Sequence, residues 1–309
     1  MSNCDVILAV YNGQDHLAPT LDSLFGQTTN DFNVIARDNG SKDDTLEILK
    51  SYKYKFDGRL RIIEGEPTGS ARANFAILMQ ETKADYVLCA DHDDIWMPDK
   101  VEMTLRSMKE GEAKFGKSTP IYFFTDVVVV NKDLEVINSS YWNFKRIDPG
   151  ISARLSQCLV CPPMLGMASG MNRALVDLSN PVPEKVTGHD WWALLVAATM
   201  GKVIYTSAKT ALYRIHGQND SAPKQVGIVP YLSAKLGAGF VRHGLGRRMD
   251  QADALIEVYG PKIPPAQMAI LQGFSKLRHE GFLRRRVTLV ARNYLYPDLV
   301  RNVATLALM

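Results

Sequence analysis

The chain carries, from residue 86 to residue 99, the stretch Tyr86-Val87-Leu88-Cys89-Ala90-Asp91-His92-Asp93-Asp94-Ile95-Trp96-Met97-Pro98-Asp99. Its apolar beginning predicts a buried strand over residues 86–90, and three carboxylates follow at the mouth of that strand. Two like charges about 4 Å apart cost roughly 4 kcal/mol at an effective dielectric constant of about 20, so such a cluster holds a cation, shares a proton or splays into solvent. Carboxylates suit Mg²⁺ or Mn²⁺, which often binds together with substrate phosphates. The structural alternative is that Asp94 caps a helix whose first turn contains Pro98.

Shorter strand-like runs precede this stretch, at residues 6–10, 32–37 and 60–64, and apolar residues recur at helical spacing between them. This alternation predicts an α/β fold with a mostly parallel sheet and helices on both faces. Polar segments at residues 11–13 and 38–41 follow the ends of two predicted strands, as residues 91–94 follow a third. Because ligands bind at the carboxyl ends of strands in open α/β sheets, the three polar segments predict one shared site.

The second part of the chain is less regular. Residues 121–130 predict a strongly apolar strand, and residues 136–137 can pair with it after a turn. A helix is expected over residues 191–200, and two short strands over residues 202–205 and 212–215. From about residue 231 the pattern is helical, so we expect a main domain over residues 1–225 and a helical extension over residues 226–309.

The composition bounds the class of protein. The chain has 309 residues, of which 46% are hydrophobic and 22% are charged, and this is typical of a globular protein. A formal net charge of +3 does not indicate a nucleic-acid partner. Its four cysteines favour a reducing compartment, and the pair Cys158 and Cys161 lacks a second pair to complete a zinc site, which favours a packing role. Without a signal-peptide pattern or a long apolar run, the expected location is cytoplasmic.

Basic and apolar residues are interleaved in the helical C-terminal part, most densely around Arg284, Arg285 and Arg286. Such a mixture is typical of helices that lie on an anionic membrane surface, and it predicts a peripheral location on the inner face of the cell membrane. The alternative is a solvated basic face on helices packed against the main domain.

Several nucleotide-binding classes are disfavoured. No Gly-x-Gly-x-x-Gly motif follows the first predicted strand, and no Gly-Lys-Ser or Gly-Lys-Thr phosphate loop occurs. Two weaker segments remain: Gly188-His189-Asp190-Trp191-Trp192, where an acid opens an aromatic helix, and Tyr213-Arg214-Ile215-His216-Gly217, where a histidine follows a short strand. In isolation, an Asp at a helix start is most often a cap, and a lone His a satisfied polar group.

In order along the chain, these segments resemble the family 2 inverting glycosyltransferases with the GT-A fold. The resemblance covers about two-thirds of the chain, from Val6 to about Asn219. The wording of the motifs around Asp93, Asp190 and His216 looks most like the bacterial rhamnosyltransferase branch, which builds cell-surface polysaccharide. It implies a GT-A domain, an Mg²⁺ or Mn²⁺ cofactor, and a dTDP- or UDP-sugar donor, with dTDP-rhamnose as the best single expectation.

The resemblance also implies roles for individual residues. Tyr11 would stack on the nucleobase, Asp38 would accept a hydrogen bond from its ring N–H, and Arg72 would contact a phosphate or ribose oxygen. Asp93 would bind the metal directly, with His216 completing its ligands. Asp91 would contact the ribose, or the metal through water.

Asp190 would act as the single general base, removing the proton from an acceptor hydroxyl that displaces the diphosphate. The acceptor would be a saccharide or a lipid-linked saccharide, and Trp96, Trp191 and Trp192 would form a platform for it, with core packing as the alternative. Two other functions stay open at this point. One is a sugar nucleotidyltransferase, which is expected to carry a Gly-rich basic loop after the first strand. The other is a catalytically silent module that binds nucleotide sugars or assists assembly.

Overall fold

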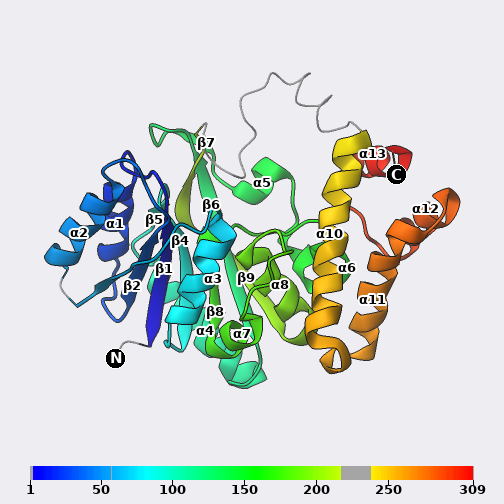
Figure 1. Ribbon diagram of the computed structural model, residues 1–309, viewed down its shortest axis with the longest axis horizontal. Coiled ribbons are helices and arrows are strands. Elements are labelled where there is room, and N and C mark those ends of the chain that lie inside the picture. Colours follow the sequence, from blue (N-terminus) through cyan, green and yellow to red (C-terminus); the bar gives the residue numbers. More distant parts are fainter. Residues whose placement is uncertain (1–2, 57, 217–237, 309) are drawn as a thin grey trace.

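The structure is a computed structural model that describes residues 3–56, 58–216 and 238–308. A single twisted sheet runs through it in the order β3-β2-β1-β4-β8-β6-β9-β5, with β7 paired to β6 (Figure 1). The strands are β1 (Cys4–Val10), β2 (Asn33–Asp38), β3 (Leu60–Ile63), β4 (Tyr86–Asp91), β5 (Ile95–Trp96), β6 (Ile121–Val130), β7 (Val136–Asn138), β8 (Ser169–Asn172) and β9 (Lys202–Arg214).

Helices flank the sheet on both faces and continue beyond it. Those of the main part are α1 (Leu17–Phe25), α2 (Thr45–Lys55), α3 (Ala71–Glu81), α4 (Lys100–Phe115), α5 (Tyr141–Lys145), α6 (Leu155–Cys158), α7 (Arg173–Ser179) and α8 (His189–Met200). The C-terminal part contains α10 (Ala238–Tyr259), α11 (Pro265–Ser275), α12 (Phe282–Ala291) and α13 (Leu299–Leu308). The predicted α/β architecture with a helical C-terminal part is confirmed.

Alternating side chains of the central strands explain the layers. In β1, Val6, Leu8 and Val10 join a core with α1, α2 and α4, whereas Ile7 and Ala9 join the core on the opposite face. Successive strand residues point to opposite faces, so a strand that is apolar throughout can bury both of them. All seven residues of β1 are buried, which agrees with a central position.

Strand direction brings the expected polar segments to one edge. Strands β1, β2, β3 and β4 are mutually parallel, and β8 inserts antiparallel between β4 and β6. Strand β9 then runs parallel to β6. The carboxyl ends of β1, β2, β4, β6 and β9 therefore lie at the same edge, which is also where β8 begins.

Two expectations are corrected here. Residues 202–205 and 212–214 belong to one long strand, β9, and Ile215 lies just beyond its end. The register of β9 against β6 shifts around Asp126, where a β-bulge leaves residues of the polar middle unpaired. The N-cap role considered for Asp94 is wrong: Ile95 and Trp96 form β5 against β9, and α4 begins only after its N-cap residue Asp99.

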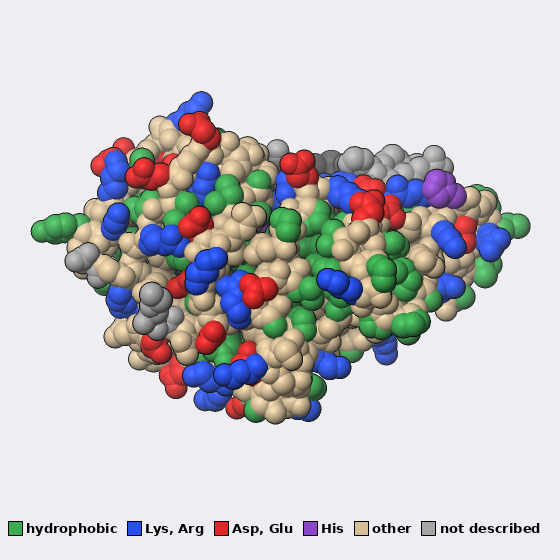
Figure 2. Space-filling view, turned by 60° about the horizontal axis from the view of Figure 1, so that its bottom comes forward, with side chains coloured by type: hydrophobic (Ala, Val, Ile, Leu, Met, Phe, Trp, Pro, Cys, Tyr) green, Lys and Arg blue, Asp and Glu red, His purple; other side chains and the backbone are tan. Residues whose placement is uncertain are grey.

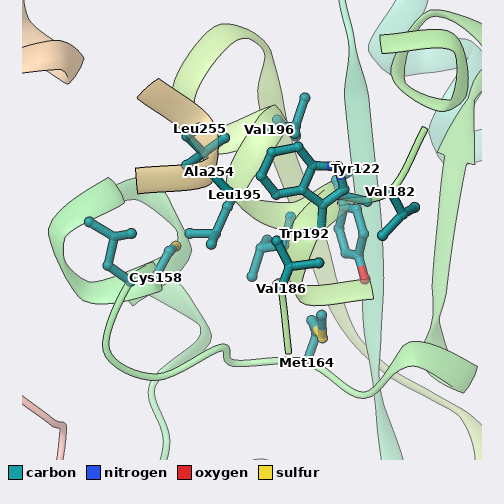
Figure 3. Close-up of a cluster of buried hydrophobic side chains, with 14 of the residues drawn as sticks. Tyr122, Cys158, Met164, Val182, Val186, Trp192, Leu195, Val196, Ala254 and Leu255 are labelled. Atoms are coloured by element: carbon teal, nitrogen blue, oxygen red, sulfur yellow. The ribbon is translucent and has the colours of Figure 1, made fainter. Parts of the chain in front are cut away.

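The C-terminal helices share the core of the main part. Ala252, Leu255, Leu271 and Phe274 belong to the same buried cluster as Trp192. Figure 3 shows Trp192 among side chains that include Tyr122 of β6 and Leu255 of α10. The predicted boundary between residues 225 and 226 lies outside the described residues.

Candidate active site

The carboxylates after β4 form the centre of the candidate site. Asp91 is the last residue of β4 and is partly exposed, whereas Asp93 and Asp94 are buried in the turn that leads to β5. Burial raises the pKa of Asp94 well above its usual value, and the neighbouring charges of Asp93 and Asp91 raise it further. The three predicted acids are therefore held together and are not splayed into solvent.

Arg214, the last residue of β9, ties that strand to the cluster. Its backbone N–H donates to Asp94 Oδ1 at 2.8 Å, and its Nε donates to the Asp93 carbonyl at 2.9 Å. Its Nη1 also donates to the Lys132 carbonyl at 3.0 Å. Sequence reasoning missed this residue, although a basic side chain at a strand end beside predicted acids was the available signal. Arg214 fixes the position of the residues that follow it.

His216 lies two residues after Arg214 and contacts the carboxylate cluster. Its Nε2 lies 2.7 Å from Asp93 Oδ2, across 123 residues of sequence. The imidazole ring of His16 lies 5.1 Å from the ring of His216, measured between centroids. The His92 ring packs against Gly13, where an added Cβ would lie only 2.6 Å from His92 Cδ2. Burial lowers the pKa of His92, and the charges of Asp93 and His216 act on it in opposite directions.

Asp93 and His216 can be tested as cation ligands. Carboxylate oxygen suits Mg²⁺ or Mn²⁺, and the imidazole adds a nitrogen donor on the same side. Among the described residues, no three His, Cys, Asp or Glu side chains form a metal-binding group. The pair thus fits a cation that takes its remaining ligands from phosphates and water, as Mg²⁺ usually does.

The loops after β1 and β2 interlock beside this cluster. Asn12, with a positive φ of 47°, donates its backbone N–H to Ser41 Oγ at 2.8 Å and accepts from the Lys42 N–H at 3.0 Å. Asp38 accepts from the Ser41 N–H at 3.0 Å. The Tyr11 side chain is 49% exposed, so its ring face is accessible. These contacts fix the two segments to which the nucleotide was assigned.

Arg72 lies in the first turn of α3, and its Nη1 is 3.4 Å from the Pro183 carbonyl. This contact directs the guanidinium toward the loop that precedes α8. No contact between Arg72 and the loops that follow β1 and β2 is seen within the described residues. Its predicted role in phosphate or ribose binding stays a prediction.

Asp190 opens α8 at the same edge of the sheet, because α8 returns directly into β9 and must run in the opposite direction. The carboxylate lies close to two glycines: an added Cβ at Gly188 would fall 2.6 Å from Asp190 Oδ1, and one at Gly166 would fall 3.0 Å from Oδ2. The preceding His189 is buried and stacks on Phe75 with 3.9 Å between ring centroids. The sequence did not single out Gly166; a role for these glycines emerges only from the three-dimensional approach.

The three tryptophans differ in position. Trp192 is fully buried and donates from Nε1 to the Ser179 carbonyl at 3.0 Å, and Trp96 is 3% exposed. Their placement does not support the expected contact with an acceptor, because core packing covers both rings. Trp191 is partly exposed, and its Nε1 donates to the Cys158 carbonyl at 2.8 Å. Of the three, Trp191 keeps the predicted acceptor role as a proposal.

The two motif cysteines are free and buried, which agrees with the expected packing role. Burial raises the pKa of the Cys158 thiol to about 12, and it also raises that of Cys161. Neither thiol is therefore activated as a nucleophile or ligand.

Comparison with known proteins places this geometry in context. A model of glycosyl transferase family 2 matches residues 5–177. The dTDP-rhamnosyl transferase RfbG of Shigella flexneri is 24% identical over 219 residues, which are 69% of this chain and 72% of that protein. The UDP-Glc:alpha-D-GlcNAc-diphosphoundecaprenol beta-1,3-glucosyltransferase WfaP of Escherichia coli is 24% identical over 225 residues, 72% of this chain and 82% of that protein.

The fold is also shared with solved structures. The mannosyltransferase PcManGT from Pyrobaculum calidifontis, in complex with GDP-Man and Mn²⁺, superposes with a TM-score of 0.53 and is 15% identical. The superposition covers 97% of this chain and 87% of that one. The fold is therefore that of the GT-A glycosyltransferases, as predicted.

Proposed function

The chain belongs to glycosyl transferase family 2, and from this premise we propose that it transfers a sugar from a nucleoside-diphosphate sugar to a hydroxyl group of a saccharide or a lipid-linked saccharide. The observation that carries the proposal is the 2.7 Å contact between Asp93 and His216, beside the interlocked loops that bear Tyr11 and Asp38. This contact supports the proposal because a carboxylate and an imidazole that meet there could share a cation near the segments assigned to the nucleotide.

Asp93 and His216 are the proposed ligands of Mg²⁺ or Mn²⁺, and Asp91 would bind the ribose or the cation through water. When bound, the cation neutralises negative charge on the departing diphosphate, which stabilises the transition state. Arg214 keeps Asp93 and Asp94 in place through its hydrogen bonds to both residues. The mannosyltransferase structure of the same fold is a complex with GDP-Man and Mn²⁺, which supports this choice of cofactor.

Tyr11 and Asp38 are the proposed nucleobase contacts, and Arg72 is the proposed contact with a phosphate or ribose oxygen. The exposed ring of Tyr11 can stack on a base, and a carboxylate such as Asp38 can accept from the ring N–H of thymine or uracil. The adjacent Asn39 accepts from the Thr68 N–H at 2.7 Å, so it supports the loop. A dTDP- or UDP-sugar is the expected donor, and the similarity to RfbG supports rhamnose.

The proposed reaction is a single inverting displacement. Asp190 would remove the proton from the acceptor hydroxyl as its oxygen attacks the anomeric carbon, and the bond to the diphosphate would break on the opposite face. The Trp191 N–H donates to Asp190 Oδ1 at 2.8 Å, which helps to hold this carboxylate. The exposed part of Trp191 would contact the acceptor sugar.

We also propose that the enzyme docks peripherally on an anionic membrane through α12 and α13. Each of six apolar side chains there is more than half exposed: Phe282, Leu283, Val287, Val290, Leu299 and Val303. Figure 2 shows apolar surface at the end of the molecule where α12 lies in Figure 1. Arg284, whose side chain is 83% exposed, adds positive charge to this face. No helix in the described part of the chain is long and apolar enough to span a bilayer.

Calorimetric titration with thymidine, uridine and guanosine diphosphates, each with and without Mn²⁺, tests the donor site. We expect Mn²⁺-dependent binding of one pyrimidine nucleotide, lost in Asp93→Ala and retained in Asp99→Ala, whose carboxylate is exposed outside the cluster. Asp190→Asn should keep nucleotide binding and lose at least about 10²-fold in turnover, because a positioned base contributes about 10² to 10⁴-fold. A protein that binds none of the nucleotides would be a silent relative.

A further inference from the structure

A ladder of alternating rings and guanidinium groups extends away from Asp190. The Arg248 guanidinium lies 5.7 Å from the ring centroid of Trp191 and 5.4 Å from that of Tyr296. The Arg301 guanidinium lies 5.8 Å from the same Tyr296 ring. Two guanidinium groups thus contact the Tyr296 ring. One of them, that of Arg248, also contacts Trp191, which follows the proposed base.

Hydrogen bonds anchor the ladder to the segment between α6 and β8. Arg248 Nε donates to the Val160 carbonyl at 2.8 Å, and Trp191 Nε1 donates to the Cys158 carbonyl. Among the residues that the structure describes, the two Nη groups of Arg248 make no hydrogen bond. Arg248 is therefore fixed through Nε while its two terminal amino groups can receive a ligand.

The charge of Lys145 acts on the same thiol, Cys161, as those of the two arginines. Burial raises the pKa of the Cys161 thiol, and the positive charges of Arg301, Arg248 and Lys145 oppose this rise. The phenol of Tyr141, whose pKa burial also raises, is affected in opposite directions by Arg301 and Asp190. The charge of Arg301 therefore acts on both Cys161 and Tyr141, and that of Asp190 acts on Tyr141.

Arg301 is an exposed member of the ladder and has one acid beside it. Asp298 lies 3.7 Å from Arg301 Nε, and the Arg301 side chain is still 47% exposed. The charge of Asp190 raises the pKa of Tyr141. Two guanidinium groups on one ring repel each other, and an anion bound between them would relieve that repulsion. Figure 1 places α5, α13 and the start of α10 toward the edge where β1, β2 and β4 end.

We propose that Arg248 and Arg301 form a subsite for a phosphate or diphosphate group of the acceptor, with Trp191 between this subsite and Asp190. The inference rests on the proposed function and names the acceptor class: a sugar esterified to phosphate, such as a lipid-diphosphate sugar, instead of a neutral saccharide. Guanidinium groups suit this role because they offer paired donors in the geometry of phosphate oxygens. The acceptor sugar would lie against Trp191 with its hydroxyl at Asp190.

Binding of geranyl diphosphate, geraniol and inorganic pyrophosphate tests the subsite. Each titration is done with Mn²⁺ and the tightest nucleoside diphosphate at saturation, so that the donor site is filled. We expect geranyl diphosphate to bind and geraniol not to bind. Arg248→Gln and Arg301→Gln should each raise the Kd at least about tenfold, the effect of one lost charge-assisted contact, and Arg248→Lys should recover part of that loss. Binding of pyrophosphate as tight as that of the ester would assign recognition to the phosphate oxygens alone.

Arg106→Gln is the matched control, because it removes an exposed arginine from α4, outside the ladder, and should leave the Kd unchanged. Equal binding of geraniol and geranyl diphosphate, or unchanged binding in both Arg248→Gln and Arg301→Gln, would overturn the inference. Nucleoside diphosphate binding is measured first in every variant. If the wild-type protein does not bind any nucleoside diphosphate, the proposed donor site is refuted. If it binds a nucleoside diphosphate but not geranyl diphosphate, only the subsite is refuted.

Discussion

Replacing Gly188 with alanine should damage catalysis without unfolding the protein. Gly188 is the N-cap of α8, with φ −152° and ψ 153°, an extended conformation that alanine adopts readily. Its backbone therefore does not require glycine. The constraint is the neighbouring carboxylate, because the new Cβ would lie 2.6 Å from Asp190 Oδ1.

The size of the effect follows from that distance. Ordinary contacts of a Cβ begin at 3.4 Å, so the Asp190 carboxylate has to move by about 0.8 Å or rotate away. A displacement of about 1 Å at a reacting group can cost about 10²-fold in rate. We expect kcat to fall by roughly 10- to 100-fold in Gly188→Ala, with the Kd for nucleoside diphosphate unchanged, because the donor loops lie on other elements.

The assay is release of nucleoside diphosphate from the donor sugar, measured together with calorimetric nucleotide binding and chemical unfolding. Gly281→Ala is the control: Gly281 is likewise the extended N-cap of a helix, and an added Cβ there meets nothing within 4 Å. Turnover in Gly188→Ala that stays within about twofold of the Gly281→Ala value would refute the role of Asp190 as the positioned base.

Three further variants test other parts of the structure. Burial lowers the pKa of Lys100 from 10.5 to about 7. Between these pH values the unfolded chain therefore binds a proton that the folded chain does not. The free energy of unfolding should then rise with pH across this window, by up to about 5 kcal/mol. Lys100→Met should remove that rise, as measured by urea unfolding at pH 7 and pH 10; an unchanged slope would contradict it. Tyr11→Ala should weaken nucleotide binding by about 1–3 kcal/mol in calorimetry, the usual value of base stacking, without changing stability. Leu283→Glu should reduce flotation with anionic vesicles but leave nucleotide binding intact, and equal flotation would exclude membrane contact through α12.

Much of the first half of the fold could be predicted, because its apolar strands alternate with polar loops and amphipathic helices. Strand β8 was missed, since Ser169-Gly170-Met171-Asn172 contains a glycine and no β-branched residue. Its place is fixed by tertiary contact: an added Cβ at Gly170 would lie 2.9 Å from Thr104 Cγ2, so the strand fits closely under α4. Polar residues in the middle of β9 led to the prediction of two short strands in place of one.

The site residues could be predicted where the residue type itself indicates the chemistry, as for carboxylates and histidine. They could not be predicted where tertiary packing decides whether a side chain is buried or exposed. The carboxylates after β4 and the late histidine meet as the resemblance implied. The burial of Trp96 and Trp192 could not be predicted, because a tryptophan on a platform and one in a core look alike in sequence. The contacts of Arg248 with Trp191 and of Arg301 with Tyr296 could not be predicted either, since they depend on how α10 and α13 fold back.

The shifted pKa values of Asp94 and Lys100 explain how the carboxylate cluster can be buried at the strand ends. Lys100, fully buried beneath it, donates to Thr210 Oγ1 at 3.0 Å and lies 4.7 Å from the Trp96 ring centroid. Because burial raises the pKa of Asp94 and lowers that of Lys100, both groups avoid the full cost of an isolated buried charge. Asp93, by contrast, faces His216 at the edge of the sheet. The proposed cation ligands Asp93 and His216 thus meet at the edge of the sheet, whereas Asp94 and Lys100 are almost fully buried.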